Sequence, residues 1–112
     1  MYIRYPQDIS LLNEAREKLE EMILWFHKTY GVDLSRRDCK AARRNYLSFA
    51  KSKKHSAKQI RKVLKKQLSY VRRDIGYLEN FLSAGYAPKQ KDIATILTIF
   101  KLYEQQQYMY DN

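Results

Sequence analysis

Lysine and arginine side chains are the residues of this sequence whose type and spacing point most clearly to a chemistry. The densest group follows helical spacing over residues 58–73. Cations on one side of a helix can contact successive phosphates of a nucleic-acid backbone, which positions a protein on DNA without reading its base sequence. The residues predicted to bind DNA are Lys58, Arg61, Lys62, Lys65, Lys66, Arg72 and Arg73, with Arg43 and Arg44 as an extension.

The positive charge is concentrated in the middle of the chain. The formal net charge is +10. Residues 36–73 hold fifteen Lys and Arg against a single acid, Asp38, which gives this stretch +14, whereas the remainder carries −4. So uneven a distribution favours an anionic partner, most often nucleic acid. The alternative is a solvated face that keeps the protein in solution, and composition alone leaves the two about equally supported.

Other candidate chemistry is weak. His27, His55 and Cys39 lack the spacing of a metal site, and a single cysteine forms no internal disulfide. The acids over residues 14–21 flank Arg16 and Lys18 at spacings typical of intrahelical ion pairs. No glycine-rich phosphate loop and no Ser/His/Asp grouping is present. We therefore expect no catalytic residue, no metal and no cofactor in this chain.

The elements that would position the basic residues are helices, because apolar residues recur at steps of three or four. The first helix is expected to start at a cap on Asp8 or Ser10, after an extended Tyr5-Pro6, and to end at Gly31. Its apolar stripe consists of Leu12, Ala15, Leu19, Met22, Phe26 and Tyr30.

Three more helices are expected. The second covers about residues 35–51, the longest runs from Ala57 to about Ser83, and the last covers about residues 89–110. Ser56 can cap the long helix and Gly85 can end it. The stripe expected on the last helix consists of Ile93, Ile96, Leu97, Phe100, Tyr103 and Tyr110.

These patterns predict an all-α fold, a bundle of about four amphipathic helices with one long central helix. The 112 residues fit a single domain, and only three glycines and two prolines argue against a turn-rich β-sandwich or barrel. No apolar run is long enough to span a bilayer, and no signal-peptide pattern opens the chain. A cytoplasmic location without membrane contact is expected.

Both ends and the centre of the sequence resemble a known family. Residues 3–8 read Ile-Arg-Tyr-Pro-Gln-Asp and are followed by Leu-Leu-Asn-Glu-Ala-Arg over residues 11–16. Residues 102–110, Leu-Tyr-Glu-Gln-Gln-Gln-Tyr-Met-Tyr, together with residues 65–74 and 77–79, complete the pattern. These segments are similar to bacterial insertion-sequence transposases of the DDE class.

The resemblance implies that catalysis belongs to another part of a larger transposase. Members of that class use three acids on a ribonuclease-H-like fold, which hold divalent metal for DNA strand cleavage and joining. By resemblance, the first acid precedes the Ile-Arg-Tyr-Pro motif, the second lies beyond Asn112, and a helical insert separates them. Asp8 belongs to the motif and receives no catalytic role. The chain is then expected to be the insert alone, a fragment or a truncated reading frame.

Two functions remain open at this point. One is a non-catalytic helical segment that contacts transposon or target DNA through its basic surface during transposition, with the rest of the transposase as a partner. The other is a helical protein-interaction or dimerisation module without direct DNA contact, indicated by the heptad-like apolar spacing of the third and last expected helices. A small free-standing enzyme is the weakest of the alternatives, because no catalytic constellation is present.

Overall fold

The protein is built from helices that turn back on one another. The computed structural model describes residues 5–32, 39–51 and 56–111, and their secondary structure contains no strand. The helices, in chain order, are α1 (Tyr5–Tyr30), α2 (Cys39–Lys51), α3 (Ala57–Ser83), a short 3-10 helix (Gln90–Asp92) and α4 (Ile93–Asp111). The expected all-α bundle is therefore confirmed, with α1 (26 residues) almost as long as α3 (27 residues).

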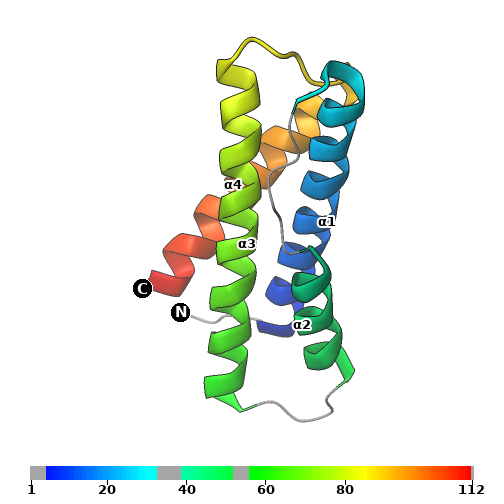
Figure 1. Cartoon of the computed structure of the whole chain (residues 1–112). Coiled ribbons are helices and arrows are strands. Elements are labelled where there is room, and N and C mark those ends of the chain that lie inside the picture. The colour runs from blue at the N-terminus through cyan, green and yellow to red at the C-terminus, as the bar shows by residue number, and fades with distance from the viewer. Residues whose placement is uncertain (1–4, 33–38, 52–55, 112) are drawn as a thin grey trace.

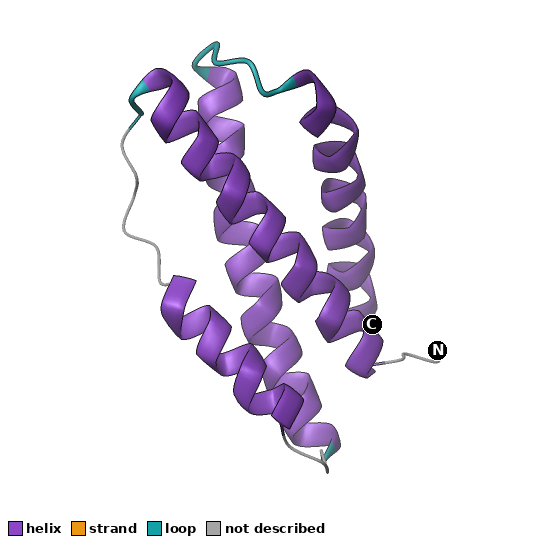
Figure 2. Ribbon diagram, turned by 90° about the vertical axis from the view of Figure 1, so that its right-hand side faces the viewer, coloured by secondary structure: helices purple, strands orange, loops and turns teal. Residues whose placement is uncertain are grey.

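α1 and α3 form the centre of the bundle and run in the same direction (Figure 1). α2, which lies between α1 and α3 in the sequence, runs in the opposite direction, and α4 starts at the end of the bundle where α1 and α3 end. Figure 2 shows α2 and α4 on opposite sides of the α1–α3 pair. The resulting molecule is elongated, with extents of 44 × 28 × 21 Å. α3 is therefore flanked by α2 on one side and by α4 on the other.

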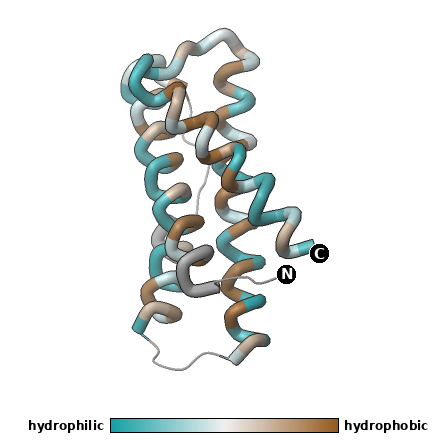
Figure 3. The backbone as a smooth tube through the Cα atoms, turned by 180° about the vertical axis from the view of Figure 1, so that it is seen from behind, coloured by the Kyte–Doolittle hydropathy of each residue, from teal (hydrophilic) through white to brown (hydrophobic). Residues whose placement is uncertain are grey.

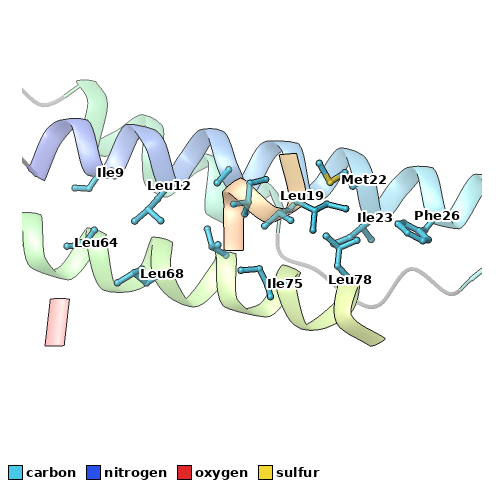
Figure 4. Packing of buried hydrophobic residues seen from close by; sticks show 14 residues of the cluster. Ile9, Leu12, Leu19, Met22, Ile23, Phe26, Leu64, Leu68, Ile75 and Leu78 are labelled. Carbon is cyan, nitrogen blue, oxygen red and sulfur yellow. The ribbon is translucent and has the colours of Figure 1, made fainter. Parts of the chain in front are cut away.

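The hydrophobic core lies mainly between α1 and α3. Ile9 faces Leu64 at one end of the pair, and Leu78 lies close to Ile23 towards the other end (Figure 4). The rings of Phe26 and Phe81 are 5.2 Å apart, still further along the seam. The parallel helices thus keep one register along their length, as a heptad-like repeat of apolar residues requires.

The boundaries of α3 agree with the sequence pattern. The hydroxyl oxygen of Ser56 accepts a hydrogen bond from the backbone N–H of Gln59, while the Gln59 side chain accepts one from the N–H of Ser56. This reciprocal cap starts the helix. At the other end Gly85 has φ of 95°, a left-handed turn that glycine adopts without steric cost. Gly31 ends α1 in the same way, with φ of 72°.

The expected start of the first helix was wrong. α1 begins at Tyr5, so the Tyr5-Pro6 pair is helical rather than extended, and Asp8 and Ser10 lie inside the helix rather than at its cap. Proline is tolerated there because the first turn leaves its backbone N–H groups unbonded in any case. The last helix starts near residue 89, as expected, with the 3-10 helix as its first turn before α4. The expected start of the second helix near residue 35, and His55, lie outside the described ranges.

The apolar stripe predicted on α4 was partly wrong. Ile93 and Leu97 are exposed, at 45% and 58%, although both were placed in the core. Ile96 is buried as expected, but Ile99 and Gln106 take the remaining buried positions. Hydrophobic residues fill the first half of α4, as Figure 3 shows, so more than one of its sides could have been the buried one.

Polar side chains also enter the core. Arg16 is 1% exposed and donates hydrogen bonds to the Asn13 side-chain oxygen at 2.7 Å and to Glu20. Gln67 is fully buried, and neither its amide nitrogen nor its amide oxygen has a hydrogen-bond partner among the described residues. Such groups are costly to bury unless their hydrogen bonds are replaced.

Candidate nucleic-acid interface

One side of α3 carries most of the predicted DNA-binding residues. The basic face, as we define it, consists of Lys58, Arg61, Lys62, Lys65, Lys66, Arg72 and Arg73. Its members recur at three- and four-residue steps, which places them on a common side of the helix. The buried residues Leu64, Leu68, Val71, Ile75 and Leu78 occupy the opposite side. The apolar side of α3 therefore packs in the core, and its opposite side holds the basic face in solvent.

The length of the basic face suits a polyanion. Lys58 and Arg73 are separated by about 22 Å along the helix axis. All its members are exposed except Arg73, which is half-buried. The neighbouring phosphates of a DNA strand rise about 3.4 Å each, so the face is long enough to follow several of them.

Neighbouring acidic residues do not neutralise the positive charge of the basic face. α2 and the part of α3 from Ala57 to Arg73 contain no acidic residue. None of the four lysines on the face forms an ion pair with a residue in the described part of the chain. The positive potential of these side chains is therefore available to a partner.

The two arginines at the margins differ from the lysines because each has a partner within the protein. Arg61 donates a hydrogen bond of 3.2 Å to the backbone oxygen of Tyr110, and its guanidinium lies 4.1 Å from the centre of that ring. Arg73 Nε is 3.6 Å from Asp74 Oδ1, and its guanidinium stacks at 5.4 Å over Tyr70. Arg61 and Arg73 therefore lie at the borders of the face, and the four lysines and Arg72 make up the rest of it.

The two arginines predicted on α2 are placed differently. Both are exposed. Arg44 precedes Ser48 by one helical turn, and Ser48 lines a cleft together with Lys62 and Lys66. Arg44 thus lies on the flank of α2 that adjoins the basic face. Arg43 lies on the other flank, because it is rotated by about 140° from Ser48 around the helix axis.

Clefts border the basic face on both sides. Between α2 and α3 a cleft of about 310 Å³ is lined by Asn45, Ser48, Phe49, Gln59, Lys62, Val63 and Lys66. A second, between α3 and α4, has Lys65 and Arg72 on its wall, with Gln107 and Tyr110 opposite. Sequence reasoning missed Asn45 and Ser48 because they are uncharged. The sequence signal for them was their position three or four residues apart from one another or next to Phe49, which places all three on one flank of a helix.

Comparison with protein-family models, with curated proteins and with solved structures found no match to this chain.

The acidic, cysteine and histidine side chains do not gather into a metal site in the described part of the protein. Within residues 5–32, 39–51 and 56–111, no three of these side chains come close enough to hold an ion together. A two-metal phosphoryl-transfer centre needs several converging carboxylates, and no such group lies among the described residues. No described helix has an apolar stretch long enough to cross a membrane.

Proposed function

We propose that this chain binds the sugar–phosphate backbone of duplex DNA through the basic face of α3, as a non-catalytic helical segment of a DDE-type transposase. The observation that carries the proposal is the row of exposed cations on one side of a helix, with no acidic side chain paired to its lysines among the described residues. Nucleic acid is the most common partner of such a surface.

The binding energy would come from counterion release. Each phosphate that a lysine or arginine neutralises frees condensed cations, so affinity falls steeply as salt rises. If five phosphates are contacted, log K declines against log salt with a slope of about −4 to −5. Backbone contacts of this kind orient a protein on DNA but carry no base specificity.

The role in transposition rests on the sequence resemblance described above. The metal-binding acids of that family have no assigned counterpart in residues 1–112, so strand cleavage would be the task of other parts of the larger protein. This segment would hold transposon or target DNA beside them. It needs no cofactor of its own for that task.

Salt-dependent titration of duplex DNA tests the proposal. The face variant carries Lys58→Gln, Lys62→Gln, Lys65→Gln and Lys66→Gln. A control variant carries Lys18→Gln, Lys28→Gln, Lys91→Gln and Lys101→Gln, all at exposed positions away from the face. Each set removes four charges, so both lower the net charge from +10 to +6.

We expect the face variant to lose at least about tenfold in affinity at low salt, and its salt slope to become shallower by about 4. The control variant should keep nearly the wild-type slope, because its lysines contact no phosphate. Equal binding by the two variants would show that net charge alone attracts DNA and would remove the basic face from the proposal.

A specific observation favours a second candidate, a helical interaction module. Ile93, Leu97 and Tyr108 of α4 are exposed, as is Leu11 of α1. Leu11 also lines a groove between these two helices, together with apolar Ala15, Ala94, Ile99 and Leu102 and polar Glu14, Lys18, Thr95 and Thr98. Exposed apolar side chains of this kind can mark a protein contact.

A further inference from the structure

The cleft between α2 and α3 combines three kinds of group at one place. Lys62 and Lys66, one helical turn apart, stand on its α3 side. Phe49 and Val63 supply apolar walls. Asn45, Ser48 and Gln59 add amide and hydroxyl groups. A ligand that fits must therefore carry negative charge, an apolar surface and polar edges.

Asn45 has an unused hydrogen-bonding atom. Its side-chain oxygen is buried and has no hydrogen-bond partner among the described residues. A carbonyl oxygen accepts hydrogen bonds, and leaving one buried and unpaired is costly. A ligand with an N–H donor on a flat ring would satisfy it once the Asn45 amide turns towards the cleft, which this residue lines. Exocyclic amino and ring imino groups of nucleobases are such donors.

The size of the cleft restricts the ligand to a small unit. At about 310 Å³ it is at the lower end of the range for small-molecule pockets. In a duplex the bases are paired and stacked, so their donors and flat faces are occupied. Within a DNA molecule, an unpaired nucleotide offers the ring, its polar edge and a phosphate together, whereas a paired one does not.

We infer that the α2–α3 cleft holds one unpaired nucleotide of a DNA single strand, with its phosphate at Lys62 and Lys66 and its base between Phe49 and Asn45. The inference rests on the proposed function, since the same lysines belong to the basic face. It adds a preference for DNA in which a single strand leaves the duplex beside α3. The strand would continue along the basic face, which a free mononucleotide could not use.

The test compares a blunt duplex with the same duplex carrying short single-stranded tails. Ser48→Trp fills the cleft from an exposed position on α2. Asn45→Leu leaves the cleft open but removes the side-chain oxygen that would accept a hydrogen bond from the base. Leu47→Trp is the matched control, because it adds the same ring at the neighbouring exposed residue on another flank of the helix. Circular dichroism verifies the helical content of each variant.

Wild-type protein should bind the tailed duplex about tenfold more tightly than the blunt one, the effect of gaining one stacked base. Ser48→Trp and Asn45→Leu should abolish this gain, so that each variant binds the tailed and the blunt duplex equally. Leu47→Trp should retain it. Deoxyadenosine monophosphate at millimolar concentration should compete poorly for the tail. Efficient competition would instead identify a free-nucleotide site and overturn the assignment to a strand.

The outcomes separate this inference from the proposed function. Blunt-duplex binding with no gain from the tail, or a gain that persists in Ser48→Trp, overturns the inference and leaves backbone binding intact. Binding of single strands that Ser48→Trp abolishes, without duplex binding, supports the cleft and overturns the duplex proposal. Failure to bind any of these DNAs overturns both.

Discussion

Arg16 places a permanent positive charge in the interior of the protein, where its side chain is 1% exposed. Its side chain is held by Asn13 and Glu20, which lie on the same helix one turn before and one turn after it. Asn13 in turn donates a 2.9 Å hydrogen bond to Glu17. Removing a charge from water is costly, and among the described residues these partners on α1 offset the cost.

Replacement of Glu20 by alanine should therefore destabilise the protein by about 2 kcal/mol, because it leaves Arg16 buried beside a lost counter-charge. Urea denaturation followed by circular dichroism measures the effect. Glu21→Ala is the control, since Glu21 is exposed, and should change stability by less than about 0.5 kcal/mol. Equal effects of the two substitutions would mean that the Arg16–Glu20 pair contributes little.

The sequence predicted the ion pair of Arg16 but not its burial. Four-residue spacing between Arg16 and Glu20 is sufficient to expect an intrahelical pair, and the pair is present. Arg16 also lies four residues after Leu12 and three before Leu19, which is the spacing of the apolar stripe. Because residue type outweighed position, a charged side chain was not expected inside. Residue type also decided the candidate site: only charged side chains were considered there, so the uncharged Asn45 and Ser48 were not predicted.

At the scale of single helices, α3 was the best predicted and α4 the worst. α3 has charges on one side, apolar residues on the other and a capping box at its start, so local pattern and tertiary packing agree. In α4 the apolar residues from Ile93 to Leu102 cover several sides. The choice between those sides depends on where α1 and α3 lie, and that information is absent from the periodicity of α4 alone.

Within α3, the consecutive residues Gln67 and Leu68 are both buried. The amide of Gln67 has no hydrogen bond to offset its desolvation in the described structure. Gln67→Leu should therefore raise the free energy of unfolding by about 1–2 kcal/mol. Thermal and urea denaturation measure it, with exposed Gln105→Leu as a control of small effect. A loss of stability would show that the Gln67 amide is needed for packing.

Across the whole molecule, the basic face of α3 lies between α2 and α4, with one cleft on each border. The exposed apolar side chains of α4 are Ile93, Leu97 and Tyr108, none of which lines either cleft. The lysines of α3 and these apolar residues can therefore be substituted separately. DNA binding and self-association need not exclude one another.

The second candidate function predicts a dimer whose fraction rises with protein concentration. Sedimentation velocity measures it over a range from a few to several hundred micromolar. Leu97→Glu, at a 58% exposed position on α4, should leave a monomer because it introduces a charge into the apolar contact. Its affinity for duplex DNA should stay unchanged. A wild-type protein that remains monomeric throughout this range would rule out self-association through α4.

The parallel arrangement of α1 and α3 has a consequence for the order of synthesis. A helix can pack against its successor as soon as both have left the ribosome, but α1 finds its principal partner only after α2 has also been made. At a few residues per second, the apolar stripe from Ile9 to Phe26 stays uncovered until Ala57–Ser83 has emerged. In this interval a nascent chain presents an amphipathic helix without a partner, and that helix is the segment on which chaperone capture would act.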